Sequence, residues 1–230
     1  MKAKCRWIIS TLALVLLSLV KSPDGAALTI KVGYPQLSGG SMPLWVIGET
    51  GLDRRYGVDL KPIYIAGGAR LTQSLIAGDV DIALTGGAVV GAILSGADLI
   101  YLAIGLSTYA FSVYAGPDIK EVPDLRGKVL GVITKGASSD HAAIALLKRY
   151  GMRAGQDVKI LYFARQSDLL AALDKRIVPA GVFSSPTNIM AQHLGFKELV
   201  NIAAFKLPYP HNAVATRRPL IRQNPELAKG

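Results

Sequence analysis

Cysteine is almost absent from this chain of 230 residues, which contains a single one, Cys5. Cys5 lies within residues 1–27, a segment with the pattern of a cleaved secretory signal, so we expect the mature chain to carry no thiol. This absence excludes disulfide bonds, cysteine-containing metal sites and a cysteine nucleophile. Stability must then come from the hydrophobic core, for which a content of 50% hydrophobic residues is sufficient.

The chain also lacks a long apolar run. The run from Trp7 to Val20 is shorter than the roughly 20 residues that a membrane-spanning helix needs, and no later stretch is apolar enough to cross a bilayer. Basic residues precede this run, and Gly25-Ala26-Ala27 supplies the small residues at which signal peptidase cleaves. We therefore expect residues 1–27 to be removed and the mature protein to be periplasmic, without stable membrane insertion.

Patterns that would support catalysis or nucleic-acid binding are missing. The three histidines, His141, His193 and His211, lack the spacing of metal ligands. Ser138-Ser139-Asp140-His141 contains the residue types of a catalytic triad, but neighbours at a helix start point in different directions and no G-x-S-x-G motif occurs. Gly86–Gly91 has the wrong spacing for a dinucleotide motif. The net charge of +10 is scattered, without the basic stripe of nucleic-acid-binding proteins. We expect no enzyme activity, metal, cofactor or nucleic-acid partner.

What the chain does contain is an internal repeat. Each copy alternates buried-strand patterns with helical periodicity, and the corresponding helices end in similar motifs, Arg54-Arg55-Tyr56-Gly57 and Lys148-Arg149-Tyr150-Gly151. The first copy has expected strands at 29–34, 58–65 and 80–84 and helices at 43–56 and 69–78. The second has expected strands at 129–133, 158–163 and 177–183 and helices after Ser138 and at 167–173.

Strands that alternate with helices predict parallel sheets covered on both faces, and two such units predict two lobes. The fold class is therefore α/β and two-lobed, each lobe being a mostly parallel sheet flanked by helices. We expect lobe one over 28–108, with a further strand at 99–106, and lobe two over 109–218, with a crossing strand at 110–115 and a return strand at 213–216. A last helix begins within 219–230. A ligand is expected in the crevice between the lobes, at the carboxyl ends of the strands.

The candidate ligand site consists of strand-to-helix turns rich in Ser, Thr and Gly. Helix starts offer free backbone N–H groups and a partial positive charge, so such turns can bind an anion without a formal cation. For any one turn, an ordinary cap or turn former is the alternative. Arg70 could clamp an anion bidentately or be a surface residue, and Tyr209 could stack on a ligand at the hinge or form a rigid surface turn. The candidates are Ser38, Gly39, Gly40, Ser41, Gly67, Gly68, Arg70, Thr85, Gly86, Gly87, Ser107, Thr134, Gly136, Ser138, Ser139, Ser184, Ser185 and Tyr209.

Several stretches resemble a known family. Tyr56-Gly57-Val58-Asp59-Leu60, Ala77-Gly78-Asp79-Val80-Asp81-Ile82-Ala83 and Asp124-Leu125-Arg126-Gly127-Lys128 are similar to motifs of the nitrate/sulfonate/taurine class of ABC-transporter solute-binding proteins, which includes thiamine-precursor binders. The resemblance covers essentially all of 28–225. It implies a type II periplasmic-binding-protein fold without a cofactor, capture of a small solute, and delivery to a membrane permease. It leaves the solute open among sulfonates, nitrate, carboxylates and others.

Two other function classes stay open at this point. A periplasmic ligand-sensing module of a signalling system could share every residue named above, and an exported enzyme acting through Ser139 is the other. A pyrimidine-precursor binding or synthesis protein is a further possibility within the family, but the enzyme branch depends on a cysteine-rich motif that is missing here.

The sequence departs from the family pattern in two places. Lys175-Arg176 and Pro179 replace the usual small-residue turn and Asp in lobe two. Family members also continue beyond residue 230, with helices that return to lobe one. We therefore expect a truncated chain whose lobe one exposes apolar surface, and a monomer if the chain is complete.

Overall fold

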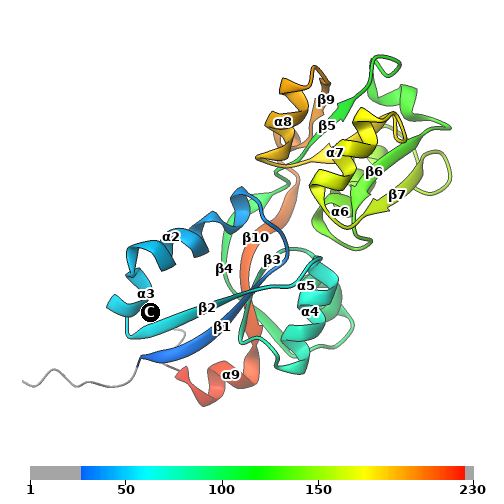
Figure 1. The fold of residues 1–230 in the computed structure, drawn as a ribbon. Helices are drawn as coiled ribbons and strands as arrows, with labels where there is room; N and C mark the ends of the chain where they lie inside the picture. The colour runs from blue at the N-terminus through cyan, green and yellow to red at the C-terminus, as the bar shows by residue number, and fades with distance from the viewer. Residues whose placement is uncertain (1–26, 226–230) are drawn as a thin grey trace, which may run out of the picture.

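The computed structural model describes residues 27–225, which form two lobes joined by two crossing segments (Figure 1). Each lobe contains a five-stranded sheet with helices packed on it, so the predicted two-lobed α/β fold is confirmed. The expected signal segment, apart from Ala27, lies outside the described residues. No helix in 27–225 has the length and apolar character needed to cross a membrane.

The sheet of lobe one has the order β2-β1-β3-β10-β4. β1 pairs in parallel with β2 and β3, whereas β10 pairs antiparallel with β3 and β4. The strands are β1 (Leu28–Tyr34), β2 (Val58–Tyr64), β3 (Ile82–Thr85), β4 (Leu99–Thr108) and β10 (Pro208–Arg217). The helices are η1 (Gly39–Ser41), α2 (Met42–Thr50), α3 (Leu52–Arg55), α4 (Gly68–Ala77), α5 (Ala88–Leu94) and α9 (Arg218–Gln223).

The sheet of lobe two repeats this plan in the order β7-β6-β8-β5-β9. β6 pairs in parallel with β7 and β8, and β5 pairs antiparallel with β8 and β9. The strands are β5 (Ser112–Ala115), β6 (Val129–Ile133), β7 (Lys159–Phe163), β8 (Ala180–Phe183) and β9 (Lys197–Asn201). The helices are η2 (Val122–Leu125), α6 (Ser138–Arg149), α7 (Gln166–Asp174), α8 (Thr187–His193) and η3 (Ile202–Phe205). Both sheets are mixed, because one strand that follows a crossing segment pairs antiparallel with both of its neighbours. This strand is β10 in lobe one and β5 in lobe two.

The duplication extends to two glycines that set the distance between helix and sheet. A Cβ at Gly33 of β1 would collide with the Leu71 side chain of α4, and a Cβ at Gly131 of β6 would collide with the Leu169 side chain of α7. Residues that alternate with them point to the opposite face, where Val32 packs with Leu44 of α2. Each sheet is thus covered on both faces, and each missing side chain lets one helix approach closely.

The predicted helix over 43–56 is wrong in one respect, because it breaks at Gly51. Gly51 has φ +62°, a left-handed conformation that glycine adopts readily, and its N–H binds the carbonyl groups of Gly48 and Ile47. The result is two short helices, α2 and α3. Helical periodicity alone does not show this break, since apolar residues continue on both sides of it.

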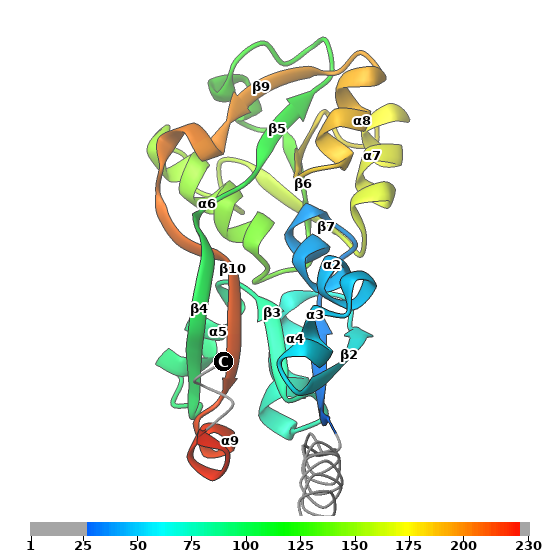
Figure 2. The same ribbon diagram turned by 90° about the vertical axis from the view of Figure 1, so that its left-hand side faces the viewer.

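Two crossing segments connect the lobes and lie side by side. One leads from β4 to β5 and the other from η3 to β10 (Figure 2). Thr108 and Pro208 are paired in the ladder at this point. Beyond it, the rings of Tyr109 and Tyr209 stack with centroids 4.1 Å apart and an interplanar angle of 21°. The stack ties the two segments together at the floor of the crevice between the lobes.

The strand β4 is an exposed edge of lobe one. Leu102, Ile104 and Leu106 are 36%, 51% and 37% exposed, and β4 pairs only with β10 among the described strands. Lobe two has the larger buried clusters, centred on residues such as Leu130, Leu146 and Val182. Leu102, Ile104 and Leu106 thus form an exposed apolar stripe along β4.

Candidate functional site

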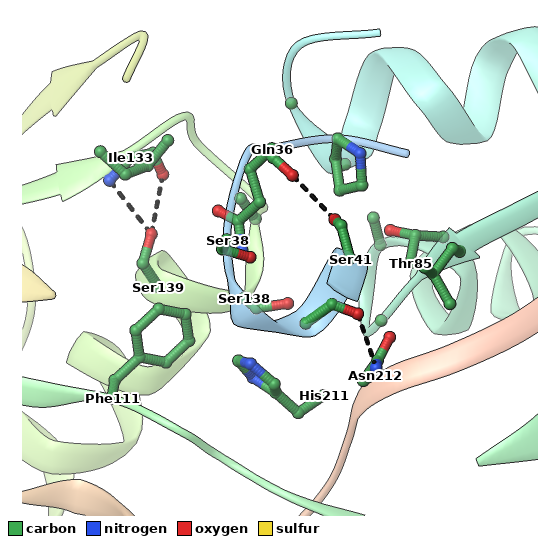
Figure 3. Close-up of a pocket in the computed structure, with 18 residues that line it drawn as sticks. Gln36, Ser38, Ser41, Thr85, Phe111, Ile133, Ser138, Ser139, His211 and Asn212 are labelled. Carbon is green, nitrogen blue, oxygen red and sulfur yellow. Dashed lines mark hydrogen bonds between the residues drawn. The ribbon is translucent and has the colours of Figure 1, made fainter. Parts of the chain in front are cut away.

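A small cleft opens where the two lobes and the crossing segments meet (Figure 3). The cavity volume of this cleft is about 50 Å³, and a volume of about 10–15 Å³ on the same measure holds one water. The cleft therefore accommodates a group the size of a few waters. Its lining comprises Pro35, Gln36, Ser38, Gly40, Ser41, Gly67, Gly68, Leu84, Thr85, Gly86, Ala88, Phe111, Ile133, Ala137, Ser138, Ser139, His211 and Asn212.

Helix starts from both lobes converge on this cleft. Gly68 opens α4, Ala88 opens α5 and Ser138 opens α6, and all three line the cleft. Within residues 27–225, the backbone N–H groups of these three residues have no hydrogen-bond acceptor. Unpaired N–H groups at helix starts carry the positive end of the helix dipole. The cleft is thus rich in hydrogen-bond donors and electropositive without a cation.

Close backbone packing shapes this surface and explains one glycine. A Cβ at Gly86 would collide with the Pro210 carbonyl oxygen and lie 2.7 Å from that of His211. Only glycine therefore lets the β3–α5 turn pass against the crossing strand β10. The same turn is held by Tyr101, whose hydroxyl donates to the Gly86 carbonyl at 2.7 Å.

Side-chain hydrogen bonds fix the other turns of the cleft (Figure 3). The Ser41 hydroxyl donates to the Gln36 carbonyl at 2.8 Å, and Asn212 Nδ2 donates to the Gly40 carbonyl at 2.9 Å. The Ser139 hydroxyl lies between the Ile133 N–H and carbonyl, at 3.0 and 3.1 Å. The polar groups are therefore arranged before a solute arrives, which reduces the entropy cost of binding.

No residue that lines the cleft is an Asp, Glu, Lys or Arg. His211 is the one titratable side chain in that lining, and its burial lowers its pKa from 6.5 to about 4. The imidazole is consequently neutral at physiological pH. Any attraction for an anion comes from N–H groups and dipoles, since formal charges are missing from the lining.

Direct contacts join the lobes around the cleft. The Gly39 N–H donates to the Ser185 carbonyl at 3.2 Å. A Cβ at Gly67, which has φ +88°, would lie 3.3 Å from the Thr134 side chain, so glycine serves here both for its conformation and for the close approach. The lobes are therefore closed on one another in this structure.

Tyr209 is a buried connector between the lobes. Its hydroxyl accepts from the Gly87 N–H at 3.1 Å, donates to Ser138 Oγ at 3.2 Å, and lies 3.1 Å from His141 Nδ1. Gly87 has no room for a side chain, because a Cβ there would collide with this hydroxyl. Burial raises the pKa of Tyr209, so the hydroxyl stays protonated. The residue reaches the start of α5 in lobe one and of α6 in lobe two from the hinge.

The structure brings half of the sequence-derived candidates into the cleft lining: Ser38, Gly40, Ser41, Gly67, Gly68, Thr85, Gly86, Ser138 and Ser139. Gly39, Ser185 and Thr134 form the contacts between the lobes described above, and Gly87 and Tyr209 lie behind the cleft. Ser184 is buried in lobe two, and the Gly136 N–H donates to Asp140. Ser107 and Arg70 are exposed and outside the lining. The clamp expected of Arg70 therefore has no counterpart in the closed cleft.

Sequence reasoning missed the residues that the crossing segments bring to the cleft, namely Phe111, His211 and Asn212. The ring of Phe111 packs edge-on against that of His211, with centroids 4.9 Å apart. A signal was present in the sequence. The polar residues His211 and Asn212 directly precede the apolar strand expected at 213–216, and their place beside a buried strand favours a position at the cleft. Gln36 was missed because it lies ahead of the glycine-rich turn.

The residue types of a triad do not assemble into one. The Ser139 hydroxyl binds the Ile133 backbone, the Asp140 carboxylate accepts from the Gly136 N–H at 2.8 Å, and His141 contacts Tyr209. Three separate structural roles thus account for the three side chains. Within residues 27–225, no group of three His, Cys, Asp or Glu residues could hold a metal ion.

Comparisons with known proteins place this geometry in context. A family model described as "NMT1/THI5 like" matches residues 41–230. No curated protein sequence matches significantly. Among solved structures, the chain is similar to the periplasmic aliphatic sulphonate binding protein SsuA from Escherichia coli, with a TM-score of 0.72, 23% identity, and coverage of 88% of this chain and 69% of that one.

Two further structures show the same fold. The alkanesulfonate-binding protein SsuA from Xanthomonas axonopodis pv. citri, bound to MOPS, matches with a TM-score of 0.72 and 21% identity, over 87% of this chain and 70% of that one. The periplasmic nitrate-binding protein NrtA from Synechocystis PCC 6803 matches with a TM-score of 0.72 and 19% identity, over 88% of this chain and 59% of that one. At these identities the likeness concerns the fold.

Proposed function

Since the chain belongs to the NMT1/THI5-like family, we propose that it is the extracytoplasmic solute-binding protein of an ABC importer. It captures a small anion between its two lobes and delivers it to a membrane permease. The observation that carries this proposal is the convergence of unpaired helix-start N–H groups from both lobes, those of Gly68, Ala88 and Ser138, on one cleft.

The electrostatics of the cleft favour an anion over a cation. Helix starts from both lobes contribute partial positive charge, and no carboxylate lines the cleft to attract a cation. An anion with several oxygens can accept hydrogen bonds from both lobes at once, so its binding stabilises the closed form over an open one. The similar structures that bind sulfonates or nitrate show that this fold serves such ligands elsewhere.

The size of the cleft suggests which part of the solute is enclosed. A space of about 50 Å³ suits a nitrate ion or the head group of a sulfonate or carboxylate rather than a large molecule. The proposed substrate class is therefore a small anion recognised chiefly through its oxygens.

The proposal assigns the protein a non-catalytic role. A nucleophile in the cleft would need a base within hydrogen-bond reach, whereas the Ser139 hydroxyl is engaged with the Ile133 backbone. Binding and release through movement of the lobes then constitute the whole activity. Delivery to the permease would be seen as solute-dependent stimulation of ATP hydrolysis by the reconstituted importer.

A thermal-shift screen over nitrate, sulfonates, carboxylates and pyrimidines tests the ligand class. A solute that binds only the folded chain at a concentration of 100 Kd stabilises it by about 2.7 kcal/mol. We expect an anion to raise the Tm and a neutral pyrimidine to leave it unchanged. A shift with the pyrimidine alone would refute the anion proposal.

Gly68→Ala tests whether this cleft is the site. A Cβ at Gly68 would contact Thr85 Oγ1 and Ala88 Cβ at an ordinary 3.4 Å, so the methyl group fits beside the unpaired N–H without strain. The methyl blocks solute access, and we expect affinity to fall at least about tenfold, or 1.4 kcal/mol, with the Tm of the apoprotein maintained. Gly91→Ala on α5, where a Cβ meets nothing within 4 Å, is the matched control. Equal affinities of both variants in calorimetry would move the site elsewhere.

A further inference from the structure

His211 is the residue of the cleft with the least explained environment. It lies on β10 at the hinge, and its ring is drawn beside Phe111 and below Ser138 (Figure 3). Its Nδ1 is buried and has no hydrogen-bond partner within residues 27–225. A buried polar atom without a partner is costly and uncommon in native proteins. With Nδ1 enclosed, Nε2 is the ring nitrogen left to face a bound solute.

No charged side chain lines the cleft beside this ring to stabilise an imidazolium. Phe111 covers one side, and the elements that line the cleft contribute only uncharged residues. Titratable groups around the start of α6, behind the cleft, belong to Tyr209, His141 and Asp140. The first two contact one another, and the Asp140 carboxylate accepts from the Gly136 N–H and the Tyr162 hydroxyl. The lowered pKa of His211 agrees with this uncharged environment.

We propose that His211 contacts the solute as a neutral hydrogen-bond donor, through Nε2–H, and thereby selects solutes that present an unprotonated acceptor oxygen. This inference rests on the proposed binding function. The imidazolium form would place an N–H at Nδ1, where no acceptor is present, so protonation leaves a buried donor unsatisfied. The Nε2–H tautomer leaves only a lone pair at Nδ1, which is better tolerated. The enclosed nitrogen thus fixes the proton on the nitrogen that faces the cleft.

A neutral donor has a consequence for pH dependence. If His211 had to be protonated to bind an anion, affinity would rise about tenfold for each pH unit lowered below the pKa of the complex. A neutral donor takes up no proton on binding. Affinity for an anion that stays ionised, such as nitrate or methanesulfonate, is then constant between about pH 5.5 and pH 8.

Calorimetry on the full chain tests this directly. Nitrate, methanesulfonate and acetate are titrated at several pH values in Tris and bis-Tris, which have different heats of ionisation and are not sulfonates. We expect the anion that binds to show the same Kd throughout and no buffer-dependent heat. Uptake of about one proton, with tighter binding at low pH, would overturn the neutral-donor role and leave the binding function intact. Failure of all three anions to bind would refute the proposed function itself.

Two variants and one spectrum test the contact with the solute. His211→Gln keeps an amide N–H near the position of Nε2 and should retain most of the affinity, whereas His211→Phe keeps a ring without a donor and should lose about tenfold or more. Equal binding by wild type and His211→Phe would remove His211 from the site. If the Phe variant does not fold, ¹⁵N spectra of the wild type decide, because the proposal requires Nε2 to carry the proton in the complex.

Discussion

Tyr209→Phe removes one buried hydroxyl while preserving the ring stack with Tyr109. The hydroxyl accepts from the Gly87 N–H at 3.1 Å, and both groups are buried. Without it, the Gly87 N–H has no acceptor and no access to water. An orphaned buried donor costs about 1–3 kcal/mol. Ser138 and His141 also lose a contact, but both border more open space and can bind water instead.

Tyr109→Phe is the matched control. Its ring takes part in the same stack, yet its hydroxyl has no side-chain hydrogen bond within residues 27–225, and burial raises its pKa to about 12. We expect this variant to change the unfolding free energy by less than about 0.5 kcal/mol. The difference between the two variants therefore isolates the hydrogen bonds of Tyr209 from the packing of the hinge.

Equilibrium unfolding in urea measures both variants, and hydrogen exchange adds a local readout. A chain of two lobes can unfold in more than one step, so the exchange rate of the Gly87 amide is followed in the native state as well. We expect Tyr209→Phe to lose about 1–3 kcal/mol and to expose the Gly87 amide. Equal losses in the two variants would show that Tyr209 acts through its ring alone.

Two further outcomes follow from the structure. Because burial lowers the pKa of His211 from 6.5 to about 4, the unfolded chain takes up a proton before the folded chain does. Stability is then full above about pH 6.5 and falls by about 2 kcal/mol by pH 5. Urea unfolding should show this loss in the wild type and a smaller one in His211→Gln, and equal losses would contradict it. The exposed stripe of Leu102, Ile104 and Leu106 should promote association. Light scattering should find fewer oligomers in Ile104→Lys, and a monodisperse wild type would argue against the idea.

The sequence predicts most of the fold because the repeat is written in strong local patterns. Strands such as Leu28–Tyr34 and Val129–Ile133 are short apolar runs, and most helix starts follow a small-residue turn, so both lobes and their order can be inferred. Strand β9 (Lys197–Asn201) was not predicted, because its sequence KELVN has no apolar run. The break at Gly51 escapes prediction, since the periodicity on both sides is helical. The pairing of β10 also escapes, because antiparallel insertion between β3 and β4 depends on residues more than a hundred positions away in the chain.

The residues of the candidate site likewise fall into those that the sequence predicts and those that only the fold reveals. Turns such as Gly67-Gly68 and Thr85-Gly86 line the cleft as expected because helix starts carry a local signature. His211 and Asn212 come from a crossing strand, and only the tertiary fold brings them to these turns. Arg70 was predicted from its position near a helix start, but only the backbone there faces the cleft, and the side chain is exposed to solvent.

The position of β10 within its sheet has a consequence for the order in which the protein can be built. All five strands of lobe two come from one continuous stretch, 112–201, so that sheet can form before residues 208–217 are available. The sheet of lobe one cannot, because its fourth strand in space, β10, is the last of the described strands in sequence. Until residues 208–217 emerge, β4 lacks the one described strand with which it pairs, and more of its apolar side-chain surface is exposed to solvent. Nascent chains would therefore be most prone to misassembly in this interval.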